Sequence, residues 1–221
     1  MPYIDFIEKI HKSTKRDYLS ERVLGVDKAK CAKISKRFGK EYWDGDRKYG
    51  YGGFKYNKKY WRNVTKEMIK YYSLNNKSTI LDVGCAKGFM LYDFKKHLPK
   101  AKVAGIDISR YAVNNSKKEV KKFLKVGNAK DLKFKDSSFD LVIAINTIHN
   151  LNKRDCAKAI REIARVSKYC SYIVLDAYKN EVEKKKMLNW NLTGKTIMNR
   201  KDWIKFLKKN NYKGDYYWFT P

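Results

Sequence analysis

Short apolar runs alternate with amphipathic segments through the middle of the chain. Such runs predict buried strands, and apolar residues spaced three or four apart predict helices. The strands are expected over 80–83, 102–106, 123–127, 139–145 and 170–176, and the helices between them over 89–97, 110–121 and 153–167. Strands that alternate with helices specify a parallel sheet covered on both faces. The pattern predicts an α/β fold with a doubly wound, mostly parallel sheet.

The region before this sheet is predicted to be helical. Apolar residues near helical spacing, with lysines between them, predict two helices within about the first 40 residues. The second helix is expected to start at Asp27, a good N-cap, and to stop at Gly39, a common residue after a helix end. Another helix is expected over 59–72. We therefore expect residues 1–77 to form a helical cap with a lid.

The region after the fifth strand completes the second expected unit, residues 78–221. A polar helix follows Asp176, and a final helix is expected over 200–210. The aromatic segment 216–219 is expected to form a strand at the sheet edge.

The segment 41–56 holds four glycines and six aromatic residues, a composition that predicts an irregular loop. Glycine permits tight backbone paths, and tyrosine and tryptophan offer flat contact surfaces with polar edges. We interpret the segment as a lid over a ligand, with a structural loop packed by its own aromatic residues as the alternative. Its candidate substrate-binding residues are Tyr42, Trp43, Asp46, Arg47 and Tyr51.

A glycine turn follows the first expected strand. Gly84 and Gly88 lie between that strand and the next helix, an arrangement that brings backbone N–H groups to a ligand. Asp107 follows the next strand 19 residues after Gly88, where a carboxylate can accept hydrogen bonds from ribose hydroxyls. The turn lacks the middle glycine of a dinucleotide fingerprint and the Gly-Lys-Ser/Thr of a phosphate-binding loop. Asp82, at the strand end, can instead receive an ammonium group.

Four motifs in order resemble those of the class I S-adenosylmethionine-dependent methyltransferases. They lie at 80–88, 105–107, 126–129 and 138–143, with a similar following helix at 161–166. The resemblance implies a Rossmann-like sheet and S-adenosylmethionine as cofactor, with S-adenosylhomocysteine as product. Relatives usually close the sheet with two antiparallel strands, but only one strand-like segment follows the last helix here. Six or seven strands are therefore expected.

The resemblance also implies roles for individual residues. Asp82, Gly84 and Gly88 are expected near the methionine part of the cofactor, and Asp107 at the ribose hydroxyls. Ile108, Asn128 and Ala129 are expected at the adenine, where many relatives have Asp in place of Asn128. The remaining candidate cofactor-binding residues are Cys85 in the turn and Asn146 after the fourth strand.

The methyl acceptor is expected beyond the fourth strand. Methyl transfer demands alignment and exclusion of water, and it needs a base only when the accepting atom is protonated. His149 is the leading candidate base, and Asn146 is the second candidate catalytic residue; both have purely structural alternatives. Further candidate substrate-binding residues are Asp176, Tyr178, Trp190 and Thr193.

The formal charge of +28 raises the question of nucleic acid. Its cations are spread along the chain, and Lys outnumbers Arg by 41 to 10, whereas base recognition favours Arg. Lysine-rich usage would also follow from an AT-rich genome. The four cysteines form no metal-ligand spacing, so no metal site is expected. Without a signal-peptide core or an apolar run of about 20 residues, we expect a cytoplasmic protein and no membrane partner.

Three functions stay open at this point. The first is methylation of a small molecule at oxygen or nitrogen, with the lid closing over it. The second is methylation of RNA or protein, using the lysine-rich surface. The third is a cofactor-binding module without methyl transfer. The glycine and aromatic content of 41–56 favours the first.

Overall fold

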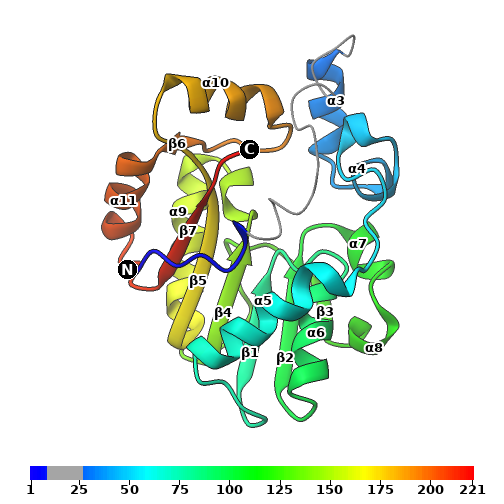
Figure 1. Ribbon diagram of the computed structural model, residues 1–221, viewed down its shortest axis with the longest axis vertical. Helices are drawn as coiled ribbons and strands as arrows, with labels where there is room; N and C mark the ends of the chain where they lie inside the picture. The colour runs from blue at the N-terminus through cyan, green and yellow to red at the C-terminus, as the bar shows by residue number, and fades with distance from the viewer. Residues whose placement is uncertain (9–26) are drawn as a thin grey trace.

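The computed structural model describes residues 1–8 and 27–221, and the first of the two expected N-terminal helices lies largely outside them. The described part is built on a sheet of seven strands (Figure 1). The strands are β1 (Thr79–Val83), β2 (Lys102–Asp107), β3 (Leu124–Val126), β4 (Phe139–Ile145), β5 (Ser167–Tyr178), β6 (Met198–Asn199) and β7 (Asp215–Phe219).

The strand order is β3-β2-β1-β4-β5-β6, with β7 also paired to β5. All of these pairs are parallel. The order reverses between β1 and β4, and ligands of open α/β sheets bind in the crevice at such a point. The predicted doubly wound parallel sheet is confirmed. The seventh strand is present, but β6 and β7 both run parallel to β5 and form no antiparallel hairpin.

The helices flank the sheet and extend beyond its carboxyl end (Figure 1). In the described part of the chain they are α3 (Lys28–Ser35), α4 (Lys40–Asp44), α5 (Lys58–Tyr71), α6 (Phe89–His97), α7 (Arg110–Asn114), α8 (Lys118–Lys121), α9 (Lys153–Val166), α10 (Glu181–Trp190) and α11 (Arg200–Lys209), with the 3-10 turns η1 (Arg47–Tyr49) and η2 (Ile148–Asn150). None of the described helices is long and apolar enough to cross a bilayer.

Alternate residues of the strands face two hydrophobic cores. On one face, Ile80 of β1 belongs to a core that includes Met68 of α5 and Phe94 of α6. On the other, Leu81 belongs to a core that includes Ile160 of α9 and Trp203 of α11. Burial of both faces is why the central strands are almost continuously apolar.

The N-terminal residues extend the sheet at its β7 edge. The Ile4 N–H donates to the Tyr216 carbonyl at 3.0 Å, and the Tyr216 N–H donates to the Pro2 carbonyl at 3.1 Å. Tyr3 pairs with Tyr216 in a parallel bridge. The segment therefore covers the exposed edge of β7, which would otherwise leave backbone groups free to pair.

Three local predictions were wrong. The helix that starts at Asp27 ends at Ser35, and Gly39 is instead the N-cap of α4. The segment 41–56 is not wholly irregular, since it contains all of α4 except its first residue, and the turn η1. The single helix expected over 110–121 is broken into α7 and α8.

The break between α7 and α8 has a local cause. The Asn115 side-chain amide donates to the Tyr111 carbonyl, and the Ser116 hydroxyl donates to the Val113 carbonyl. The Lys117 N–H turns away from the helix and donates to the Lys87 carbonyl at 3.1 Å. Asn and Ser side chains that bond backbone groups compete with helix continuation.

Candidate functional site

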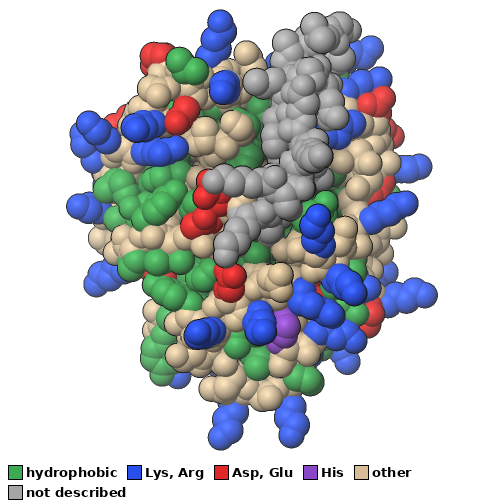
Figure 2. Space-filling view, in the orientation of Figure 1, with side chains coloured by type: hydrophobic (Ala, Val, Ile, Leu, Met, Phe, Trp, Pro, Cys, Tyr) green, Lys and Arg blue, Asp and Glu red, His purple; other side chains and the backbone are tan. Residues whose placement is uncertain are grey.

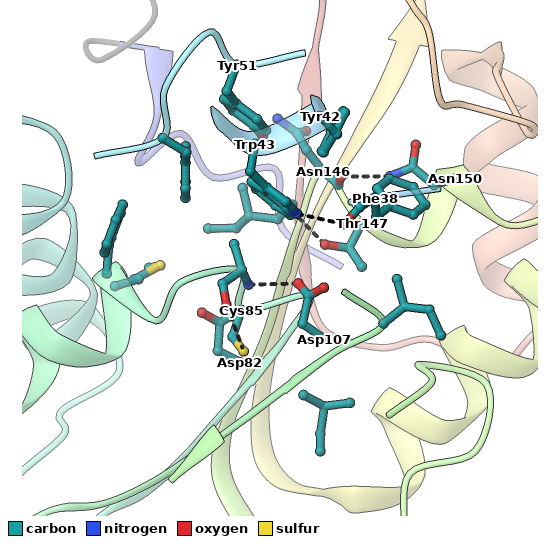
Figure 3. Close-up of a pocket in the computed structure, with 18 of the residues that line it drawn as sticks. Phe38, Tyr42, Trp43, Tyr51, Asp82, Cys85, Asp107, Asn146, Thr147 and Asn150 are labelled. Carbon is teal, nitrogen blue, oxygen red and sulfur yellow. Dashed lines mark hydrogen bonds between the residues drawn. The ribbon is translucent and has the colours of Figure 1, made fainter. Parts of the chain in front are cut away.

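A cavity of about 680 Å³ lies at the carboxyl ends of β1, β2 and β4. Its volume is within the range of roughly 300–1,000 Å³ for small-molecule sites. The lining comes from the glycine turn after β1, the tips of β2 and β4, the end of α3, the lid segment and α5. Figure 3 shows Asp82, Cys85 and Asp107 on one side of the space, with Tyr42, Trp43 and Tyr51 across it.

The glycine turn owes its path to close backbone approach. Gly84 has φ +86°, and a Cβ there would collide with the Thr147 side chain. Gly88 is the N-cap of α6 with φ +72°, where a Cβ would lie 2.9 Å from Leu124. Ala86 also has a positive φ, +50°, so this alanine occupies a conformation that favours glycine. The turn therefore keeps its left-handed geometry without a middle glycine.

Asp107 holds the glycine turn to the tip of β2. One of its carboxylate oxygens accepts from the Ala86 N–H, and the other accepts from the Ser109 N–H, both at 2.7 Å. Burial raises the pKa of Asp107, and these two hydrogen bonds oppose that rise. The carboxylate is fixed between two backbone donors at the edge of the cavity.

Asp82 is a buried carboxyl group in the cavity that lacks a hydrogen-bond donor within the described chain. Its side chain is 5% exposed, and it accepts no hydrogen bond from the described residues. Burial, and secondarily the nearby Asp107, raises the pKa of Asp82 to about 8. A buried carboxyl without a partner favours its neutral form, and a bound cation would reverse that preference.

The lid segment contacts residues that follow β1 and β2. The Trp43 indole N–H donates to the Ser109 hydroxyl at 2.9 Å and to the Phe38 carbonyl at 3.1 Å. The Trp43 and Tyr51 rings stack at 5.2 Å between centroids, and Phe54 stacks on Phe89 at 5.0 Å. Aromatic residues of the lid thus form a wall of the cavity.

An ion pair joins the lid to the glycine turn. The Lys87 ammonium donates to both Asp44 carboxylate oxygens, at 2.7 and 2.6 Å, and to the Phe54 carbonyl at 3.0 Å. Burial opposes ionisation of Asp44, but bonds from Lys87, the Phe54 N–H and Tyr111 outweigh it and lower the Asp44 pKa. Neither Asp44 nor Lys87 was predicted. The sequence gives no signal that singles out this pair, because the lid carries further acids and cations, among them Glu41, Asp46 and Arg47.

Two residues at and just after the tip of β4 line the cavity and carry buried amide oxygens. Asn146 has a left-handed backbone, φ +50°. The Asn150 side chain donates to the Asn146 carbonyl at 3.2 Å. Asn146 Oδ1 and Asn150 Oδ1 are both buried without a hydrogen-bond partner, and both residues line the cavity. Buried amide oxygens of this kind indicate a missing donor, such as a ligand N–H or O–H.

His149 lies behind this wall, outside the lining of the cavity. Its ring is buried; Nδ1 accepts from the Asp176 N–H at 3.2 Å, and Nε2 lies 3.3 Å from Asp176 Oδ2. Burial lowers the pKa of His149, against an opposing effect of Asp176. The Asn191 amide also donates to Asp176, at 2.6 Å. These contacts anchor η2 to β5 and to the segment after α10.

The predicted site residues fall into two groups. Those that line the cavity are Tyr42, Trp43, Tyr51, Asp82, Gly84, Cys85, Asp107, Ile108, Asn128, Ala129 and Asn146, with Gly88 at the adjoining helix start. Those outside the lining are Asp46, Arg47, His149, Asp176, Tyr178, Trp190 and Thr193. Asp46 caps η1 and pairs with Lys48, and the Arg47 guanidinium donates to the Gly50 carbonyl.

Comparison with known families agrees with this geometry. The family described as "Methyltransferase domain" matches residues 74–218, about two thirds of the chain. The chain belongs to the S-adenosylmethionine-dependent methyltransferases. The matched range begins just before β1 and ends one residue before the end of β7, so it covers nearly the whole sheet.

Individual relatives of this methyltransferase are distant. An uncharacterized protein of Methanocaldococcus jannaschii is 36% identical over 113 residues, 51% of this chain and 41% of that protein. The YcgJ protein of Bacillus subtilis has a TM-score of 0.54 at 22% identity, covering 66% of each chain. A geranyl diphosphate C-methyltransferase of Streptomyces coelicolor, solved with S-adenosylhomocysteine, has a TM-score of 0.53 at 12% identity over 66% of this chain and 60% of that one. These structures share the fold.

The residues present fit S-adenosylmethionine. Asp82 lacks a partner that the ammonium of the methionine part would supply. Gly84, two residues later, has no side chain, so a ligand can approach its backbone closely. Asp107 stands at the tip of β2, where ribose hydroxyls are bound in this kind of fold. Ile108, 54% exposed, offers an apolar surface to the adenine.

Proposed function

We propose that this methyltransferase acts on a small molecule held in the cavity beneath the lid. The observation that carries the proposal is that one cavity joins the cofactor residues, the tip of β4 and the aromatic lid. A lid packed directly on the glycine turn favours a compact acceptor, because it leaves a bounded space and excludes water from the reacting atoms.

The chemistry supplied by bound S-adenosylmethionine is a methyl group on a sulfonium: a new C–O or C–N bond forms as the C–S bond breaks, sulfur keeps the electron pair, and the acceptor loses its proton. The chain's own contribution is alignment. Asn146 and Asn150 can accept hydrogen bonds from the acceptor's N–H or O–H. The aromatic rings of the lid hold its apolar body.

Calorimetry with S-adenosylhomocysteine, followed by an acceptor screen, tests this function. We expect one cofactor per chain and methyl transfer to a metabolite-sized molecule. Cofactor binding without transfer to any acceptor would favour a binding module, and absence of binding would overturn the proposal.

Methylation of RNA or protein is the second candidate function, and the charge of +28 favours it. Figure 2 shows lysine and arginine side chains scattered over the visible face. This candidate requires tight binding of RNA that weakens steeply with salt. Weak binding at physiological ionic strength would exclude it.

The general-base role of His149 remains part of the proposal. For that role, Nδ1 would have to give up the Asp176 N–H and take the ring proton, and Nε2 would have to exchange its contact with Asp176 for the acceptor. We expect His149→Ala to lower turnover about a hundredfold, the scale of a lost general base. Calorimetry should show unchanged cofactor affinity. Unchanged turnover would remove His149 from the mechanism.

A further inference from the structure

The charged side chains that line the cavity are divided between two sets of elements. The acids Asp82 and Asp107 stand on the strands β1 and β2. The cations stand outside those strands, after α3, before α5 and before β6. Among the described lining residues they are Lys36, Arg37, Lys55 and Lys195, and no further charged residue lines the cavity.

The two acids offset at most half of this positive charge. Asp107 accepts from two backbone N–H groups, and Asp82 is the residue that fits the cofactor's ammonium. None of the four cations forms an ion pair with another residue of the described chain. All four cations are exposed. An excess of one charge around a cavity attracts ligands of the opposite charge.

Lys195 lies beside the segment that carries the buried amide oxygens. Its backbone N–H donates to the His149 carbonyl at 3.0 Å, and the adjacent Thr196 N–H donates to the same carbonyl at 2.9 Å. Asn150, with its unpartnered amide oxygen, is the next residue after His149. The wall around the tip of β4 therefore offers both a cation and acceptors for a donor group.

We propose that the methyl acceptor is a small organic anion that carries a carboxylate or phosphate, and also a hydroxyl or amine donor at the atom to be methylated. The inference rests on the proposed function and specifies its substrate class. The lining cations bind the acid group, the unpartnered oxygens of Asn146 and Asn150 accept from the donor, and the lid rings pack on the apolar body. RNA phosphate is the competing source of negative charge.

Binding of matched probes to the protein saturated with S-adenosylhomocysteine tests this class. The anionic probes are 4-hydroxybenzoate and 4-hydroxyphenyl phosphate, and their uncharged counterparts are 4-hydroxybenzamide and 4-hydroxybenzyl alcohol. Charge-assisted hydrogen bonds predict that at least one anion binds about tenfold tighter than its neutral counterparts. The stronger of the two anions identifies carboxylate or phosphate as the recognised group.

Matched variants assign this preference to the cavity. Lys195→Gln and Arg37→Gln should each reduce the anion's advantage severalfold. Lys213→Gln, at an exposed lysine outside the lining, should preserve it. Thermal melting with S-adenosylhomocysteine verifies that each variant is folded and loaded.

The outcomes separate the two proposals. Failure to bind S-adenosylhomocysteine overturns the proposed function itself. Normal binding of S-adenosylhomocysteine with no anion preference, or without binding of either anion, overturns the acceptor class alone. A single-stranded RNA that displaces the anions and binds tighter than both would also overturn it, in favour of a nucleic-acid acceptor.

Discussion

The side of the cavity that we assign to the cofactor and the side that we assign to the acceptor are built by different means. The cofactor side consists of the turn 82–88 and Asp107, on adjacent strands, and its geometry depends on backbone conformation and two carboxylates. The acceptor side draws on the lid, η2 and Lys195, which only tertiary packing brings together. The difference teaches that a binding turn can be specified locally, whereas an acceptor pocket depends on long-range contacts.

Gly84→Ala changes the turn on the cofactor side and should have the largest effect of these substitutions, a loss of cofactor affinity. The added Cβ would collide with Thr147 in a backbone conformation that alanine rarely adopts. We expect affinity for S-adenosylhomocysteine to fall about a hundredfold, measured by calorimetry.

Two controls sharpen this result. Gly39→Ala should leave affinity unchanged, since its Cβ would meet no atom of the described chain within 4 Å. Thr147→Ala added to Gly84→Ala should restore part of the loss by removing the collision. Full affinity in Gly84→Ala would show that the turn does not hold the cofactor.

The same contrast explains what the sequence could predict. Helix α6 and strand β4 match the expected ranges, 89–97 and 139–145, because their apolar spacing is strong and their ends carry clear signals. Strand β6, two residues long, has no periodicity to detect. The break after α7 depends on side-chain bonds of Asn115 and Ser116 that propensity alone does not reveal.

Among the site residues, too, those with a local sequence signal were predicted and those that depend on tertiary packing were not. Asp82 and Asp107 were predicted from positions at strand ends, and both line the cavity. Asp44 and Lys87 lie 43 positions apart, and pattern alone could not pair them. His149 follows β4 at the expected place, but packing against β5 turns its ring toward Asp176. The division of the chain at 77/78 stays a prediction.

Asp44→Asn tests the link between the two sides. It replaces the carboxylate beside Lys87, whose side chain is only 8% exposed, with a neutral amide, and leaves a buried ammonium without a counter-charge. We expect the free energy of unfolding to fall by about 2 kcal/mol, less than for a fully buried pair. Chemical denaturation measures this change.

The pair also has a defined pH dependence. Because the Asp44 pKa is lowered in the folded protein, its stabilisation is present above the unfolded pKa and is lost as pH falls through the folded value. Asp46→Asn, at an exposed lid carboxylate, should leave stability unchanged. Equal stability of Asp44→Asn and the natural protein would show that this ion pair does not stabilise the contact between the lid and the turn.

Asp82 gives the smallest of these effects, a pH dependence of cofactor binding. With a pKa of about 8, Asp82 is mainly neutral at pH 7, and ionisation at higher pH prepares it for an ammonium. Affinity for S-adenosylmethionine should rise about fivefold between pH 7 and 8 through this group. Asp82→Asn should abolish that component, and an identical pH profile in the variant would contradict the assignment.

Asp82 affects the ligand-free protein in the opposite sense. Its folded-state pKa lies above the unfolded value, so its favourable contribution to stability is present at low pH and is lost as pH rises through about 8. Asp82→Asn should therefore make the thermal stability of the ligand-free protein less sensitive to pH between pH 5 and pH 9. Thermal melting over that range measures the change.

The most direct test of a small-molecule methyltransferase follows the label itself. The protein is incubated with S-adenosylmethionine carrying a tritiated methyl group and with a cell extract divided by size filtration. We expect label in the metabolite fraction, with Gly84→Ala as the inactive control. Label confined to the RNA or protein of the retained fraction, or incorporated in neither fraction, would contradict it.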